Sequence, residues 1–175
     1  EDSSLEDPIA ARRDRYLRMF RSSKEQAPLR AANLGTIKPR QLDWFWRGYI
    51  VRGYVTLVVG EPGCGKSTFA SMLMAAGSRG TALPGDHKGR RFRSALVSME
   101  EDIASQVLPR LLRHEADCNY VALLENTQDC RIDTVEGLMA VSAFLDQQRA
   151  DVLFLDPLVE LIAAGTDANR ANEVR

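Results

Sequence analysis

The chain has 175 residues, a length that suits one well-packed domain rather than two domains of ordinary size. Hydrophobic residues make up 45% of it and charged residues 27%, which excludes a disordered or fibrous protein. The net charge of -1 excludes a surface that is basic throughout, so any contact with nucleic acid must come from a local patch.

The cysteines and the N-terminal residues indicate where in the cell the protein is expected. Cys64, Cys118 and Cys130 are odd in number and widely spaced, which favours neither a disulfide framework nor a zinc site. The acidic start lacks the order of a signal peptide, and no apolar run approaches the roughly 20 residues of a membrane span. We therefore expect a cytoplasmic protein that does not enter a membrane. Because the first residue is Glu1 and not Met, we also expect a piece of a longer product.

Residues 1–35 are expected to form an N-terminal arm and linker. Ile9, Tyr16, Leu17 and Phe20 recur at roughly helical spacing among arginines, which predicts a short helix with one apolar stripe. Two interpretations stay open: the helix packs on its own domain, or it docks on a neighbouring subunit. A nucleic-acid contact by the arginines is less favoured, because such runs are more commonly solvated faces.

An aromatic cluster opens the second predicted region, residues 36–175. Trp44–Trp46 is followed by Gly48 and Gly53, which are expected to frame a turn. The next run, Tyr54–Val59, is rich in β-branched and apolar residues. Such a run is typical of a strand buried on both faces of a parallel sheet.

A glycine-rich loop follows this run, with the specific pattern of a glycine, four residues and then Gly-Lys-Ser. Gly63 and Gly65 permit backbone angles that let successive N–H groups face one concavity, which binds phosphate together with the next helix N-terminus. We expect Lys66 to reach the β- and γ-phosphates of a nucleoside triphosphate, and the Ser67 hydroxyl to ligate Mg²⁺. The expected nucleotide-binding residues are Gly60, Glu61, Pro62, Gly63, Cys64, Gly65, Lys66, Ser67 and Thr68.

Helices and strands alternate through the rest of the chain, which predicts a parallel α/β sheet with right-handed crossovers. Asp133, with Glu136 three residues later, is the expected cap of the last helix. The expected elements are a helix ending near Gly77, a basic loop over 78–93, a strand over 95–99, a helix over 103–113, a strand over 120–124, a helix over 133–149 and a strand over 152–155.

Asp156 ends the last predicted strand, as in a Walker B segment. An apolar strand that ends in a carboxylate buries itself and delivers that group towards Mg²⁺, usually through water. Many strands end in Asp, so the pattern gains its meaning from the phosphate loop earlier in the chain. The alternative is that Asp156 caps a turn before Pro157.

Glu100 follows the strand predicted over 95–99, at the edge of an open α/β sheet where ligands bind. A carboxylate there could orient and deprotonate the water that attacks the γ-phosphate. Glu101 and Asp102 compete for this role, or are acidic first-turn residues of the next helix. The chemistry alone favours Glu100 only slightly.

With these residues in place, the chain resembles the RecA-like ATPases of the RepA type, which are hexameric plasmid and phage replicative helicases and their relatives. In that family the first member of the acidic pair is the catalytic glutamate, so the resemblance favours Glu100. The run here holds one acidic residue more than usual, which leaves Glu101 open. The matching pieces are the lead-in Asp43–Gly53, the loop Gly60–Ser67, the second strand Ala95–Asp102, the Walker B segment Phe154–Leu158, and Asp167, Asn169 and Glu173–Arg175.

The resemblance implies a RecA-like P-loop NTPase fold, a mainly parallel sheet flanked by helices, over residues 36–175. We expect the rest of the family's fold, with a γ-phosphate sensor, DNA-binding loops and an arginine finger, to lie beyond Arg175. The activity implied is Mg²⁺-dependent ATP hydrolysis by a homo-oligomeric ring, in the family a hexamer. The ring would move on or remodel single-stranded DNA, coupled to DNA unwinding or translocation in replication, through regions outside this chain.

In this interpretation Lys66 and Glu100 are catalytic, and Ser67 and Asp156 hold the metal. Two other function classes stay open. One is a regulatory or partner-remodelling ATPase without helicase activity. The other, weaker alternative is a small-molecule P-loop kinase, in which the basic run Lys88–Arg93 would imitate a lid.

Overall fold

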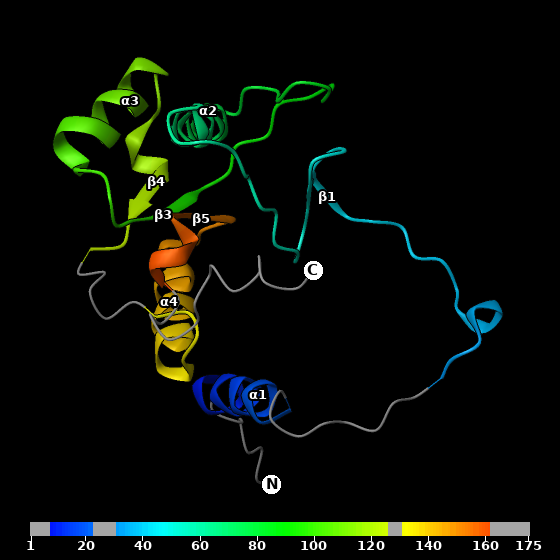
Figure 1. Ribbon diagram of the computed structural model, residues 1–175. Coiled ribbons are helices and arrows are strands. Elements are labelled where there is room, and N and C mark those ends of the chain that lie inside the picture. The colour runs from blue at the N-terminus through cyan, green and yellow to red at the C-terminus, as the bar shows by residue number, and fades with distance from the viewer. Residues whose placement is uncertain (1–7, 23–30, 126–130, 162–175) are drawn as a thin grey trace, which may run out of the picture. The chain divides into compact units, whose positions relative to one another are not determined.

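The computed structural model describes residues 8–22, 31–125 and 131–161 (Figure 1). The chain divides into two compact units. Unit 1 takes its residues from 1–39, 128–143 and 159–175, and unit 2 from 40–127 and 144–158. Helix α4, Val135–Gln148, contributes residues to both units.

Unit 2 is built on a three-stranded parallel sheet with the order β4-β3-β5. The central strand β3, Ser94–Ser98, is buried over its first four residues. It pairs on one side with β4, Val121–Leu123, and on the other with β5, Val152–Asp156. The α/β fold class and the parallel sheet predicted from the sequence are confirmed.

Two helices cover one face of this sheet (Figure 1). They are α2, Lys66–Arg79, and α3, Leu108–Arg113, which follows a π-helical turn η2 at Ile103–Val107. Met74 of α2 packs with Leu96 of β3, and all but a few per cent of both side chains is removed from water. This burial fixes the first helix after the glycine-rich loop on the central strand.

The aromatic lead-in Asp43–Gly53 forms a hairpin, and its Trp46 packs in a core cluster of unit 2 with Leu73, Ala76 and Leu83. β1, Trp44–Trp46, pairs antiparallel with β2, Ile50–Val51, through a turn that contains Gly48. The turn predicted between Gly48 and Gly53 is therefore wrong in its position, because Ile50 and Val51 form a strand there. Trp46 is 5% exposed, and its indole N–H donates to the Pro84 carbonyl at 2.9 Å. Since a buried indole N–H needs an acceptor, this bond ties the lead-in to the loop after α2.

The strand predicted over Tyr54–Val59 is wrong. Residues 55–60 have no regular structure, and the side chains of Val55 and Val59 are 89% and 81% exposed. β-Branched residues favour an extended backbone, but a strand forms only where another strand satisfies its N–H and C=O groups. Within the described residues β5 pairs with β3 alone, and no strand pairs with this run.

Two helix boundaries also differ from the prediction. α2 continues past Gly77 to Arg79 and ends at Gly80, whose left-handed φ of 74° closes the helix. The cap of α4 is Thr134 rather than Asp133, because the Thr134 hydroxyl accepts the Gly137 N–H at 3.1 Å. The Asp133 carboxylate instead accepts two hydrogen bonds from the Arg131 guanidinium.

Three further short helical turns complete the described elements. They are 3₁₀ turns: η1 at Leu34–Thr36, η3 at Cys118–Tyr120 and η5 at Leu158–Leu161. η3 leads directly into β4, and η5 follows β5.

The N-terminal helix predicted from the arginine-rich run is α1, Pro8–Ser22, in unit 1. The Arg12 guanidinium donates to the Ser142 hydroxyl of α4 at 2.8 Å, within the same unit. This contact favours the interpretation in which the helix packs on its own chain. The described helices include none that combines the length and apolar character needed to cross a membrane.

Gly77 is the position at which α2 tolerates no side chain. A Cβ there would lie 2.2 Å from the ring of Phe92, which is 6% exposed and makes an edge contact with Phe45 at 4.8 Å. We expect Gly77→Ala to destabilise the chain by about 1–3 kcal/mol because the ring must shift in a packed core. In an exposed helix the same change would stabilise by about 1 kcal/mol.

Urea unfolding followed by circular dichroism measures this effect. The double variant Gly77→Ala/Phe92→Leu serves as the control, because the smaller side chain makes room for the methyl group and should recover part of the loss. A Gly77→Ala chain as stable as the parent would contradict the packing described.

Candidate nucleotide site

The glycine-rich loop has the backbone that its sequence predicts. Gly63 and Gly65 take φ values of 76° and 95°, in the left-handed region that favours glycine. α2 begins directly after Gly65, at Lys66. The unpaired N–H groups and the positive dipole end of this helix therefore lie at the loop, where they favour an anion.

The Lys66 ammonium is held by the loop itself. It donates to the Gly60 carbonyl at 2.8 Å and to the Glu61 carbonyl at 3.0 Å. Both acceptors are neutral, and a phosphate oxygen is a stronger partner for an ammonium because the bond is charge-assisted on both sides. These contacts hold the Lys66 ammonium at the loop but do not pair its positive charge with a negative one.

Ser67 and Asp156 line the same small pocket of unit 2. Asp156 and Ser98 are the last residues of β5 and β3 and are paired in the sheet, so the pocket lies at the carboxyl edge of the strands. The sequence predicts this edge as the ligand side of the sheet. The pocket is lined by Ser67, Ala70, Ser71, Met74, Leu96, Ser98, Glu101, Val107, Arg110 and Asp156.

The three acids after β3 have three different environments. Glu100 is exposed and does not line the pocket. Glu101 lines it and accepts two hydrogen bonds from Arg110, at 2.7 and 2.8 Å. Asp102 caps η2, where its carboxylate accepts from the Ser105 N–H at 2.7 Å and from the Ser105 hydroxyl at 2.6 Å.

These contacts fix the charges beside the pocket. The hydrogen bonds from Arg110 lower the pKa of Glu101, so its carboxylate is ionised at neutral pH. The Ser105 hydrogen bonds lower the pKa of Asp102 in the same sense. The hydrogen bonds to Glu101 raise the pKa of Arg110, and the charge of Asp156 adds to this effect. Arg110 therefore carries its positive charge close to both carboxylates.

Comparison with known proteins gives the family. A family model described as an AAA domain matches residues 20–175, nearly the whole chain. The chain belongs to this family. An AAA domain is a P-loop nucleotide-binding ATPase, in agreement with the fold class and the loop described above. Comparison with curated proteins and with solved structures gives no match.

The pocket of this AAA domain offers oxygen ligands of the kind that Mg²⁺ prefers, in the Ser67 hydroxyl and the Asp156 carboxylate. The buried Ser98 hydroxyl, which also lines the pocket, has no hydrogen-bond partner. A buried polar group without a partner is costly, so a bound water or ligand oxygen would stabilise it. The described residues hold no cluster of three or more His, Cys, Asp or Glu side chains fit for a metal. Mg²⁺ sites in ATPases need only one or two carboxylates, because phosphate and water supply the remaining ligands.

Sequence reasoning missed Ser98 and Arg110. Ser98 could have been found, because it ends a predicted strand at the ligand edge of the sheet. Arg110 had no such signal: it lies nine residues after Glu101, a separation that matches no helical repeat.

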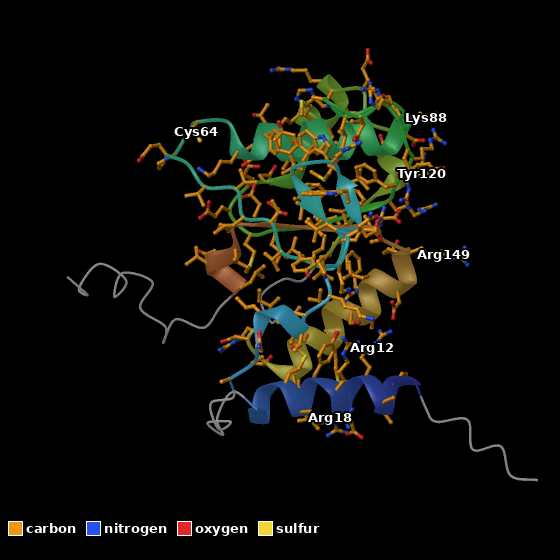
Figure 2. All side chains as sticks on the ribbon, turned by 90° about the vertical axis from the view of Figure 1, so that its right-hand side faces the viewer. Arg12, Arg18, Cys64, Lys88, Tyr120 and Arg149 are labelled. Carbon is orange, nitrogen blue, oxygen red and sulfur yellow. The ribbon has the colours of Figure 1, made fainter. Side chains whose placement is uncertain are left out.

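The basic run Lys88–Arg93 lies away from the phosphate loop. In Figure 2 Lys88 and Tyr120 lie on the opposite side of the view from Cys64 of the loop. Arg91 and Arg93 stack on the Tyr120 ring at 4.5 and 4.9 Å. The run ends where β3 begins, at the amino edge of the sheet, whereas the pocket lies at the carboxyl edge.

Proposed function

We propose that this AAA domain is the catalytic core of a Mg²⁺-dependent ATPase that works as a ring of identical subunits and is coupled to movement on single-stranded DNA in replication. The pocket that joins Ser67 of the phosphate loop to Asp156 of β5 is the observation that carries the hydrolytic part. The DNA-coupled part is supported by the resemblance of the lead-in Asp43–Gly53 and the Asp156-Pro157-Leu158 segment to the RepA type.

The phosphates would bind to the loop and to the start of α2. Lys66 exchanges the carbonyls of Gly60 and Glu61 for β- and γ-phosphate oxygens, which is favourable because opposite charges then pair. Ser67 and Asp156 would hold Mg²⁺, which neutralises the charge on the β- and γ-phosphate oxygens when bound. The protein's part is to place these oxygen ligands at fixed positions on α2 and β5.

A carboxylate after β3 would orient the attacking water. Glu100, predicted from the sequence, stays a candidate for this role. The geometry favours Glu101, because this residue lines the pocket with Ser67 and Asp156 while Glu100 is exposed. A general base must lie within hydrogen-bond reach of the water that it orients.

Lys66→Ala tests the nucleotide-binding part. We expect it to lower ATP turnover by at least about a hundredfold, because the positive charge on the γ-phosphate is lost. The fold should survive, since Lys66 belongs neither to the core cluster around Trp46 and Leu73 nor to the one around Met74 and Leu96. Phosphate release under saturating ATP is the measurement.

Lys38→Ala is the matched control for Lys66→Ala, because it removes the same charge from an exposed position outside the loop. It should keep the parent turnover. Equal turnover in the parent and the Lys66→Ala chain would contradict the assignment.

Glu100→Gln and Glu101→Gln separate the two candidate bases. The variant of the true base should keep ATP binding and lose about 10²-fold or more in kcat, because only the water-orienting carboxylate is changed. From the geometry we expect this loss for Glu101→Gln. A loss confined to Glu100→Gln would return the role to the residue predicted from the sequence.

DNA-stimulated hydrolysis tests the finer proposal. We expect single-stranded DNA to raise the ATP turnover of the full-length protein several-fold and to favour a ring by analytical ultracentrifugation. Turnover and assembly indifferent to DNA would favour a regulatory or partner-remodelling ATPase. The contacts of Arg91 and Arg93 with Tyr120, at the other edge of the sheet, speak against a kinase lid.

A further inference from the structure

Arg110 holds the Glu101 carboxylate by both of its oxygens. One terminal nitrogen of the guanidinium donates to Oε2 at 2.8 Å and the other to Oε1 at 2.7 Å. The side chains are 22% and 25% exposed, so water competes weakly for these bonds. A two-point contact between two planar groups fixes the orientation of the carboxylate as well as its position.

The backbone on both sides of the pair is anchored. Asp102 caps η2, and its carbonyl accepts the N–H groups of Gln106 at 3.0 Å and Val107 at 3.3 Å. Val107 and Leu111, which flank Arg110 in sequence, are 4% and 5% exposed and pack in the same core cluster. The π-helical turn leads into α3, whose buried Leu111 fixes the helix in the core, so the backbone holds Arg110 near Glu101.

The two-point contact leaves part of the carboxylate for water. An ionised carboxylate has about four acceptor positions, and Arg110 uses two of them. The remaining acceptor positions are on the Glu101 carboxylate, and Glu101 lines the same pocket as Ser67 and Asp156. A free glutamate would sample many rotamers, whereas this one is held in place before any substrate arrives.

We propose that Arg110 is a positioning residue, which aims the Glu101 carboxylate at the water that attacks the γ-phosphate. This inference rests on the proposed ATPase function. In hydrolysis the water oxygen bonds to the γ-phosphorus while the bond to the bridging oxygen of ADP breaks. The proton of the water passes to Glu101 and from there to the phosphate product.

A purely structural ion pair, or a direct contact of Arg110 with the γ-phosphate, would behave differently. A structural pair contributes to the stability of unit 2 but leaves kcat of the folded chain unchanged. A direct phosphate contact acts whether or not residue 101 is a carboxylate. A positioning role acts only through Glu101, so its effect vanishes when Glu101 is already neutral.

The experiment compares Arg110→Gln, Arg110→Lys, Glu101→Gln and the double variant Glu101→Gln/Arg110→Gln. Each chain is checked by urea unfolding, titrated with ATP at equilibrium and assayed for kcat. Arg113→Gln is the matched control, since it removes the same charge from an exposed position on the same helix. Lys66→Ala reports on the proposed function in the same series.

The positioning role predicts a kcat lower by about ten- to a hundredfold in Arg110→Gln, with the Kd for ATP within about twofold of the parent. The kcat of Arg110→Lys should be nearly as low, because an ammonium keeps the positive charge but cannot make the two-point contact with the Glu101 carboxylate. The double variant should be no slower than Glu101→Gln, and Arg113→Gln should match the parent.

An unchanged kcat in folded Arg110→Gln would overturn the role, as would a further equal loss in the double variant. A loss of ATP affinity as large as the loss of kcat would overturn it in favour of a direct phosphate contact. Any of these outcomes would overturn only the role of Arg110, and the ATPase function would still be supported if Lys66→Ala is inactive. Equal ATP binding and turnover in the parent and in Lys66→Ala would instead remove the proposed function, and the role of Arg110 with it.

Discussion

The parallel pairing of β3 with β5 is the constraint on which the site depends. It sets Ser98 opposite Asp156 at the carboxyl ends of two neighbouring strands. The acidic run Glu100–Asp102 follows β3 at this edge of the sheet. Met74 of α2 packs against Leu96 of β3. Since α2 is fixed there, Ser67 in its first turn comes to line the same pocket as Asp156. A shift of β5 against β3 would move Asp156 away from Ser98 and from the other residues of this pocket.

The carboxyl edge of the sheet also depends on the charges that surround the pocket. Glu101 and Asp156 line one small pocket, and two carboxylates close together repel each other. The Arg110 guanidinium offsets that repulsion by pairing with Glu101 and by its attraction to Asp156. Glu101 is thus held by Arg110, while Asp156 lines the same pocket from β5. In the function proposed above, Asp156 would bind the divalent cation while Glu101 stays paired with Arg110.

Local patterns in the sequence predicted the parallel sheet and the helix after the glycine-rich loop, and they indicated Ser67 and Asp156, which line one pocket. Periodicity and motif spacing are properties of neighbouring residues, and the chain order of strands fixes which ends share an edge. Tyr54–Val59 shows the limit of this reasoning, because its residues favour a strand but cannot provide the partner that a strand requires. Arg110 shows another limit. Its contact with Glu101 spans the cap at Asp102, a π-helical turn and the start of α3, and no local pattern predicted that turn.

The central claim is that Ser67 and Asp156 act together on a metal-bound nucleotide. Mn²⁺ is a paramagnetic substitute for Mg²⁺, and electron paramagnetic resonance measures the free ion, so that the bound ion follows by difference. The account predicts that ATP promotes Mn²⁺ binding by the parent chain, and that Ser67→Ala/Asp156→Asn reduces this ATP-dependent binding by at least tenfold, about 1.4 kcal/mol. The same ATP-dependent Mn²⁺ binding in the parent and in a folded double variant would contradict it.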